Sequence, residues 1–274
     1  MAYDAKQELA RVRKYYASDP LQKRFSAIVT GETNAGKTYL LRTARKPIHV
    51  DCFDPGGTQC LRDLIASGDV IADTFWQNED PFSPKVFAEW KKTTDIRFLT
   101  KYYDMFGTYC IDSLTTFSKA VMNFQLASVN RTGETPQHRK DYNPQKNIIE
   151  NYINKLLSLP CDFILTGHLR EIEELIAVDP STGIRRTNIK YRLYITGQAV
   201  ITIPLLFDEL YVITGKGTPP KREMLIDSLG TYVARSRLKM NGKLDAIEEP
   251  NIVKLLKKSG FPWEDKPRLE KQDV

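Results

Sequence analysis

The chain has 274 residues, a length typical of one domain or of one domain with an appendage. Hydrophobic residues make up 41% of it and charged residues 27%, a balance typical of a protein that buries a sizeable core. The net charge of +6 permits contact with a polyanion but does not require it.

The first residues lack a signal-peptide pattern, and no apolar run approaches the length of a membrane span. We therefore expect a cytoplasmic protein without a membrane partner. The cysteines show no C-x-x-C spacing, which favours small, reduced and buried side chains. This expectation applies to Cys52, Cys60, Cys110 and Cys161.

Residues 4–17 predict a helix, because Leu9, Val12 and Tyr16 recur on roughly one face. Asp19-Pro20 ends that helix before the first strand. A helix in this position can pack on its own domain or on a neighbouring subunit, and we expect the first.

A glycine-bearing loop follows the first expected strand, residues 25–30. It reads GETNAGKT and fits the G-x-x-x-x-G-K-[ST] pattern of P-loop NTPases. Residues 39–45 predict a helix that Pro47 ends, and the start of that helix would add partial positive charge to the site. The sequence therefore predicts a phosphate-binding loop made of Gly31, Glu32, Thr33, Asn34, Ala35, Gly36, Lys37 and Thr38.

Each part of this loop has a chemical task. The glycines let several backbone N–H groups point at one phosphate. Lys37 can reach the outer phosphates, and the Thr38 hydroxyl can take one position around Mg²⁺. A glycine-bearing turn with an exposed lysine is the alternative, and the strand before the loop and the helix after it disfavour it.

The later segments alternate between strands and helices. We expect strands at 48–51, 70–72, 109–112, 163–168 and 210–213, and helices at 84–92, 114–128, 147–157 and 252–258. Residues 129–145 predict an exposed loop, and the runs 171–178 and 187–195 predict a hairpin around 179–183. The alternation predicts an α/β fold with a mostly parallel sheet and helices on both faces. We divide the chain into an N-terminal helix, 1–21, a core, 22–245, and a C-terminal tail with one short helix, 246–274.

Carboxylates follow two of these strands. Asp112 ends an apolar strand, as the Mg²⁺-binding aspartate of a Walker B motif does, although it could instead cap the next helix. Ser113 could provide that cap, so we favour the metal role. The next residue is not the glutamate that often acts as base, so the carboxylate that orients the attacking water must come from Asp51 or Asp54. We favour Asp54, whose alternative is a turn residue before Pro55.

His168 closes the strand that ends in Leu165-Thr166-Gly167-His168. A polar residue at this point can sense the terminal phosphate and transmit its loss to the segment that follows. The alternative is a structural histidine, and we favour the sensor.

Together these residues resemble the RecA-like core ATPases, and specifically the phage nucleotide-binding proteins associated with single-strand annealing. GETNAGKT, residues 111–115 and residues 165–168 carry the resemblance, with later support from 207–209, 234–237 and 249–252. It covers roughly residues 22–260. RecA-like enzymes usually place Glu in the acidic loop, where this chain has Asp54.

The resemblance implies a RecA-like P-loop core that binds ATP with Mg²⁺ and hydrolyses it, slowly and with stimulation by single-stranded DNA. It implies a homo-oligomer, ring or filament, that acts in phage recombination or repair by annealing or strand exchange. Phage or host single-strand binding protein would be a further partner, and the host cytoplasm the location.

Two groups of cations are candidates for other contacts. The hairpin carries Arg185, Arg186, Lys190 and Arg192 interleaved with Tyr191 and Tyr194, a composition that suits single-stranded DNA as well as a solvated hairpin. Arg235 and Arg237 could act as an arginine finger in the same or a neighbouring subunit, or could be surface arginines.

Two other function classes stay open. A nucleotide or small-molecule kinase shares the phosphate loop, although residues 129–146 lack clear lid chemistry. A nucleotide-gated assembly factor or DNA-packaging accessory with little hydrolysis would also fit the Asp54 carboxylate.

Overall fold

The computed structural model describes residues 4–18, 24–137, 140–178, 185–216 and 221–269. A twisted sheet forms its centre, and the strands run in the order β10-β8-β7-β1-β5-β4-β2-β3. The pairs among β1 to β5 and β7 are parallel, while β8, β9 and β10 join antiparallel at one edge. The strands of the parallel part are β1 (Ser26–Gly31), β2 (Ile48–Cys52), β3 (Val70–Asp73), β4 (Thr108–Asp112), β5 (Asp162–Val178) and β7 (Glu209–Lys216).

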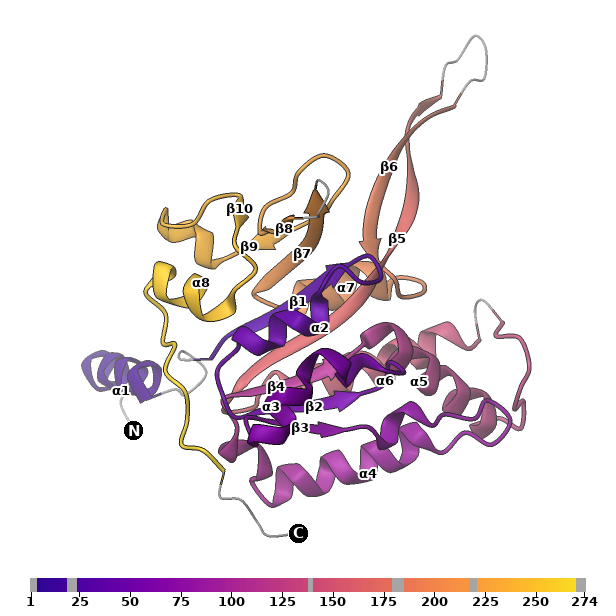
Figure 1. Cartoon of the computed structure of the whole chain (residues 1–274), viewed down its shortest axis with the longest axis horizontal. Helices are drawn as coiled ribbons and strands as arrows, with labels where there is room; N and C mark the ends of the chain where they lie inside the picture. The colour runs from indigo at the N-terminus through magenta and orange to yellow at the C-terminus, as the bar shows by residue number, and fades with distance from the viewer. Residues whose placement is uncertain (1–3, 19–23, 138–139, 179–184, 217–220, 270–274) are drawn as a thin grey trace.

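Helices cover both faces of this sheet (Figure 1). Neighbouring residues of one strand enter different cores: Ile28 packs with the residues of α4 to α7, and Val29 packs with those of α2 and α8. This alternation follows from the two-residue period of a strand. The first face holds α4 (Val86–Leu99), α5 (Leu114–Ser128), α6 (Tyr142–Leu156) and α7 (Ala199–Leu206), and the second holds α2 (Lys37–Leu40), α3 (Arg62–Ser67) and α8 (Ile252–Ser259). The expected α/β fold, with a mostly parallel sheet between two helical layers, is confirmed.

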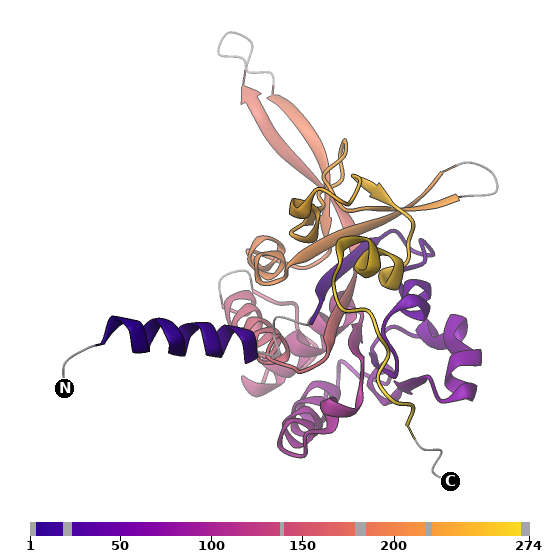
Figure 2. The same ribbon diagram turned by 90° about the vertical axis from the view of Figure 1, so that its left-hand side faces the viewer.

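The outer part of β5 leaves the sheet and pairs with β6 (Arg185–Leu193). The two strands form an arm that projects from the body (Figures 1 and 2). The expected strand at 163–168 and the first hairpin run at 171–178 are therefore one continuous strand, and the turn expected at 179–183 lies outside the described residues. The arm begins at Leu169, directly after His168, where β5 stops pairing with β1 and starts pairing with β6.

The N-terminal helix α1 (Ala5–Ser18) buries none of its residues and stands away from the body (Figure 2). The expectation that it packs on its own domain is wrong. Leu9, Val12 and Tyr16 are all exposed. Periodicity shows that a helix has an apolar face, but it carries no information on what covers that face.

Several element bounds differ from the expected ones. The helix after the phosphate loop ends at Leu40 and gives way to a 3₁₀ turn, Leu41–Thr43, while α6 begins earlier, at Tyr142. The short elements α3, α7, β8 (Lys221–Leu225), β9 (Arg235–Ser236) and β10 (Ile247–Glu248) had no clear sequence signal. β10 extends the sheet beside β8. Leu255 and Leu256 of α8 are buried in the core on this face of the sheet.

All four cysteines are free, and three of them are buried while Cys60 is half-buried. Within the described part of the chain, no helix has both the length and the apolar character that a membrane crossing needs.

Candidate nucleotide site

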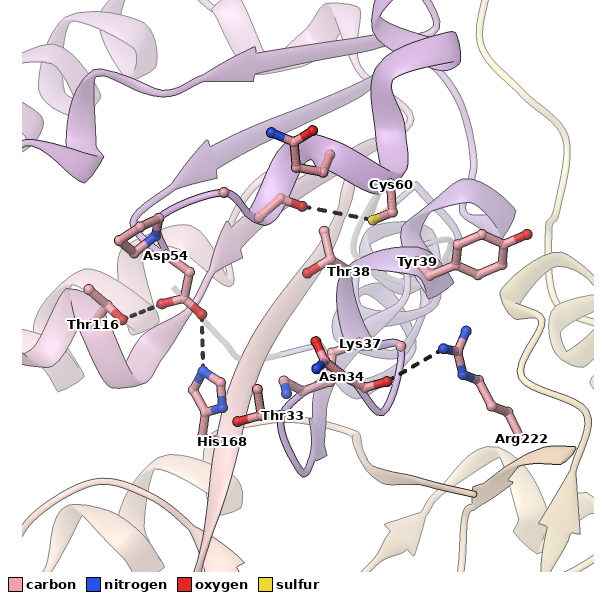
Figure 3. A pocket seen from close by; sticks show the side chains of 15 residues that line it. Thr33, Asn34, Lys37, Thr38, Tyr39, Asp54, Cys60, Thr116, His168 and Arg222 are labelled. Carbon is pink, nitrogen blue, oxygen red and sulfur yellow. Dashed lines mark hydrogen bonds and ion pairs between the residues drawn. The ribbon is translucent and has the colours of Figure 1, made fainter. Parts of the chain in front are cut away.

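A cavity of about 730 Å³ opens over the phosphate loop, at the carboxyl ends of β1, β2, β4 and the sheet part of β5 (Figure 3). Ligands of open α/β sheets bind at this edge. Besides the loop, the residues around the cavity come from segments far apart in the sequence, and they include Asp54, Cys60, Thr116, His168 and Arg222.

The curl of the loop depends on its glycines. A Cβ on Gly31 would lie 2.8 Å from the carbonyl oxygen of Ile213 in the neighbouring strand, so no larger residue fits there. Gly36 has a φ of 102°, a left-handed conformation that side chains rarely adopt. Glycine is therefore required at position 31 because the neighbouring strand lies so close, and at position 36 because of the backbone conformation.

Lys37 is buried and folds back over the loop. Its Nζ donates to the carbonyl oxygens of Gly31 and Glu32, at 3.1 and 2.9 Å. Burial lowers the pKa of Lys37, while the negative charges of Asp112 and Asp54 oppose that change. The ammonium group thus contacts the loop and is within electrostatic reach of the two carboxylates.

Asp112 is fully buried and accepts hydrogen bonds from hydroxyl groups on both its oxygens. Thr38 Oγ1 donates to Oδ2 at 2.8 Å, and Thr166 donates to Oδ1. Burial raises the pKa of Asp112, and the two hydroxyl groups oppose the rise. The Asp112–Ser113 peptide bond is cis. A carboxylate beside a hydroxyl, both oxygen donors, fits the preference of Mg²⁺, so Thr38 and Asp112 are the residues that would hold this ion.

Asp54 lies across the cavity from the loop and is held by three side chains. His168 Nε2 lies 3.1 Å from Oδ2, Ser113 Oγ donates to Oδ1 at 2.9 Å, and Thr116 donates to the same Oδ1. Burial by itself raises the pKa of Asp54, but the hydrogen bonds from His168, Thr116 and Ser113 outweigh it, and the pKa is lowered. Ser113 occupies the cap position of α5, yet its hydroxyl makes no cap hydrogen bond, so its expected capping role is wrong.

Asp51 lies away from the cavity in the aromatic core. Its carboxylate accepts from the indole N–H groups of Trp76 and Trp90, from Arg97 and from the Tyr109 hydroxyl. Burial raises the pKa of Asp51, but His49, Arg97 and Tyr109 together shift it well below its usual range. Of the two candidate carboxylates, Asp54 lines the cavity and Asp51 does not.

Asp51 belongs to a group of three side chains that lie close enough together to suggest a metal site. The group consists of His49, Asp51 and Asp73. The Arg97 guanidinium bridges the two carboxylates, at 2.9 and 2.7 Å. Because a fixed cation already pairs with both carboxylates, we assign the group a structural role.

His168 lies opposite Gly31 in the parallel register of β1 and β5. Its backbone N–H donates to Thr115 Oγ1 at 3.1 Å, and that hydroxyl donates to the carbonyl oxygen of Tyr194, at the base of the arm, at 3.2 Å. One residue of α5 therefore connects the strand end at the cavity with the arm.

Arg222 of β8 is a cavity residue that no sequence pattern indicated. Its Nη2 lies 3.4 Å from the carbonyl oxygen of Asn34, and its guanidinium carbon lies 5.8 Å from the centre of the Tyr39 ring. It reaches the loop because β8 pairs with β7, which pairs with β1. No spacing along the chain relates Arg222 to the loop, so only the sheet order could reveal it.

The basic residues of the arm are placed apart from the cavity. Lys190 and Arg192 both form ion pairs with Glu174, on the facing strand. Arg185 and Arg186 belong to β6, and their side chains lie outside the described part of the structure. Because β5 also carries the exposed Glu171 and Glu173, the arm has mixed charge.

Neither Arg235 nor Arg237 lines the cavity. Arg235 donates to the carbonyl oxygens of Pro204 and Phe207 at the end of α7, and Arg237 pairs with Asp208 at 2.5 Å. Asp208 also bonds Ser26, at the opposite end of β1 from the loop. An arginine finger within the same subunit is therefore wrong, and one across subunits stays a prediction.

No protein-family model matches this chain, and no curated protein matches it. Among solved structures, it is similar to the flagellar accessory protein FlaH from Methanocaldococcus jannaschii. That similarity covers 75% of this chain and 79% of FlaH, with 13% identity and a TM-score of 0.38. A likeness at this level carries no statement about function, which therefore rests on the geometry of the cavity.

Proposed function

We propose that this protein is a Mg²⁺-dependent RecA-like ATPase. The observation that carries the proposal is Asp54, a carboxylate held by His168, Ser113 and Thr116 on the far side of the cavity from Lys37. A phosphate-binding loop alone would only bind a nucleotide. A carboxylate fixed opposite that loop can also orient a water molecule.

Each residue then has a definable task. The loop backbone and Lys37 bind and orient the phosphates. Mg²⁺ held by Thr38 and Asp112 would neutralise phosphate charge. Asp54 accepts a hydrogen bond from the attacking water, and its lowered pKa keeps it ionised but makes it a weak base. Slow hydrolysis is the expected result.

His168 is proposed as the residue that responds to the terminal phosphate. Its side chain contacts Asp54, and its backbone is linked through Thr115 to the arm. A change in the position of Asp54 on loss of phosphate would thus reach the arm by direct contacts.

For the arm we propose single-stranded DNA as the partner, with a role in phage recombination or repair. The projecting shape, the cations of β6 and the aromatic residues support it (Figure 1). The acidic residues of β5 limit it, because they compete with phosphates for the same cations. Assembly into a ring or filament, and contact with a single-strand binding protein, belong to the same proposal.

The test is an ATPase assay with and without single-stranded DNA, comparing the wild type with Asp54→Asn. We expect Asp54→Asn to bind ATP within a few-fold of the wild type and to lose about 10²- to 10⁴-fold in turnover. Asp104→Asn is the matched control, because Asp104 is exposed and outside the cavity.

A nucleotide-gated assembly factor is the second candidate, favoured by the lowered pKa of Asp54. It would bind ATP and change its oligomeric state without turnover. Transfer of phosphate to a nucleoside monophosphate would instead show a kinase. Absence of both ATP binding and DNA binding by the wild type would contradict the leading proposal.

A further inference from the structure

The cavity has two chemically different ends (Figure 3). Asp54, Thr116 and His168 lie at one end, and Tyr39 and Arg222 lie at the other, with Lys37 and Thr38 between them. If hydrolysis takes place beside Asp54, as proposed above, the terminal phosphate lies at that end. The nucleoside must then extend toward Tyr39 and Arg222.

Tyr39 presents an aromatic ring to this second end. It follows Thr38 directly and is 51% exposed, whereas the next two residues of the chain, Leu40 and Leu41, are buried. An exposed ring at the edge of a cavity has no packing role in the core. The guanidinium carbons of Arg42 and Arg222 lie over this ring, 5.4 and 5.8 Å from its centre. A nucleobase is also a flat group, and it can stack on the ring in place of one of them.

Arg222 is the cation of this end. Its guanidinium lies against the loop, where a Cβ on Gly36 would be 3.1 Å from it. Among the described residues, no carboxylate forms an ion pair with Arg222. Arg42, which also lies near Tyr39, is by contrast tied to Asp63. Arg222 is therefore the guanidinium at this end that remains available to an anion.

We infer that Tyr39 and Arg222 form the nucleoside end of the site: the base stacks on the Tyr39 ring, and Arg222 binds the phosphate nearest the ribose. This inference rests on the proposed orientation of the nucleotide. It adds a phosphate-binding cation from the same subunit, on a strand that follows the loop by more than 180 residues.

The same geometry predicts weak selectivity among bases. Strong discrimination requires buried polar groups that are left unpaired by the wrong base. Besides Arg42, the polar cavity side chains near this end include Asn34 and Gln59, which are both exposed, and Cys60, whose thiol donates to the Gly57 carbonyl oxygen. Stacking uses a ring face that every base has, so ATP, dATP and GTP should bind within about tenfold of one another.

Binding of MgATP, MgGTP and inorganic tripolyphosphate with Mg²⁺ to the full chain tests the inference. We expect Tyr39→Ala to weaken ATP and GTP binding about 5- to 100-fold and to leave tripolyphosphate binding unchanged, because only the nucleotides carry a base. Tyr39→Phe keeps the ring and should bind as the wild type does.

Arg222→Ala should weaken both nucleotide and tripolyphosphate binding about 10-fold or more. Lys221→Ala is the matched control, since it removes an adjacent exposed cation of β8 that does not line the cavity. Melting temperatures close to that of the wild type show that each variant is folded.

Equal losses of ATP and tripolyphosphate binding in Tyr39→Ala, or no loss in Arg222→Ala, would overturn the inference. A wild type that binds neither nucleotides nor tripolyphosphate would instead overturn the proposed function, so the two failures are distinguishable.

Discussion

His168 Nε2 lies 3.1 Å from Asp54 Oδ2, a contact between residues 114 positions apart. The residue placed to orient water is therefore held by the residue placed to report on the phosphate. Because a carboxylate only accepts hydrogen bonds, the histidine donates in this contact. Any movement of one side chain changes the position of the other.

We expect His168→Ala to lower ATP turnover about 10- to 100-fold while ATP affinity stays within a few-fold, because Asp54 loses one of its three donors. His168→Gln retains an amide donor and should recover part of the loss. Steady-state turnover with and without single-stranded DNA measures both effects. If the two variants behave alike in every condition, the hydrogen bond to Asp54 is not the function of His168.

Lys37→Ala should abolish detectable nucleotide binding, since Lys37 is the buried cation of the loop. Thr38→Ala should retain some nucleotide binding but lose its dependence on Mg²⁺, because the hydroxyl beside Asp112 is removed. Equilibrium binding of ATP in the presence of Mg²⁺ or of a chelator distinguishes the two variants. Full Mg²⁺ dependence in Thr38→Ala would remove Thr38 from the metal site.

Asp51→Asn should lower the free energy of unfolding by about 3 kcal/mol, because Arg97 and two indole N–H groups lose a buried charged partner. Urea denaturation measures it. Asp63→Asn, which removes an exposed partner of Arg42, should leave stability nearly unchanged. If both variants lose a similar free energy of unfolding, burial of the carboxylate does not determine how much it stabilises the fold.

The pH dependence of stability follows from the same carboxylate. The pKa of Asp51 is lower in the folded chain than in the unfolded one, so folding favours its ionised form. The contribution of Asp51 to the stability of the folded chain is present above the unfolded-state pKa, about 4. It is lost as the pH falls toward the folded-state pKa. Below about pH 4 the wild type should therefore lose more stability than Asp51→Asn does. If the stability of both proteins falls by the same amount as the pH is lowered, this assignment is wrong.

Glu174→Gln should strengthen binding of single-stranded DNA about 3- to 10-fold and steepen its salt dependence, because it frees Lys190 and Arg192 for phosphates. Glu173→Gln is the matched control: it removes the same charge from the same strand and leaves both ion pairs in place. Fluorescence anisotropy at several salt concentrations measures the effect. Equal gains in both variants would point to overall charge rather than to the release of specific cations.

Sequence patterns alone predict the phosphate loop, the strand that ends in Asp112, the start of the strand that carries His168, and the alternation that makes the fold α/β. These features are local: a strand, a turn or a helix start depends on residues within one short segment. The choice of Asp54 over Asp51 also came from the sequence, through the Pro-Gly-Gly turn that follows Asp54.

Which side chains meet is visible only in the folded chain. Arg222 reaches the loop through two strand pairings, Asp51 is neutralised by Arg97 from another element, and Ser113 bonds Asp54 rather than capping its helix. The folded chain also shows that the apolar face of α1 is not covered by the rest of the described protein. The physical reason is that strand order and side-chain contacts depend on residues far apart in the chain, whereas hydrophobic periodicity reports only on neighbours.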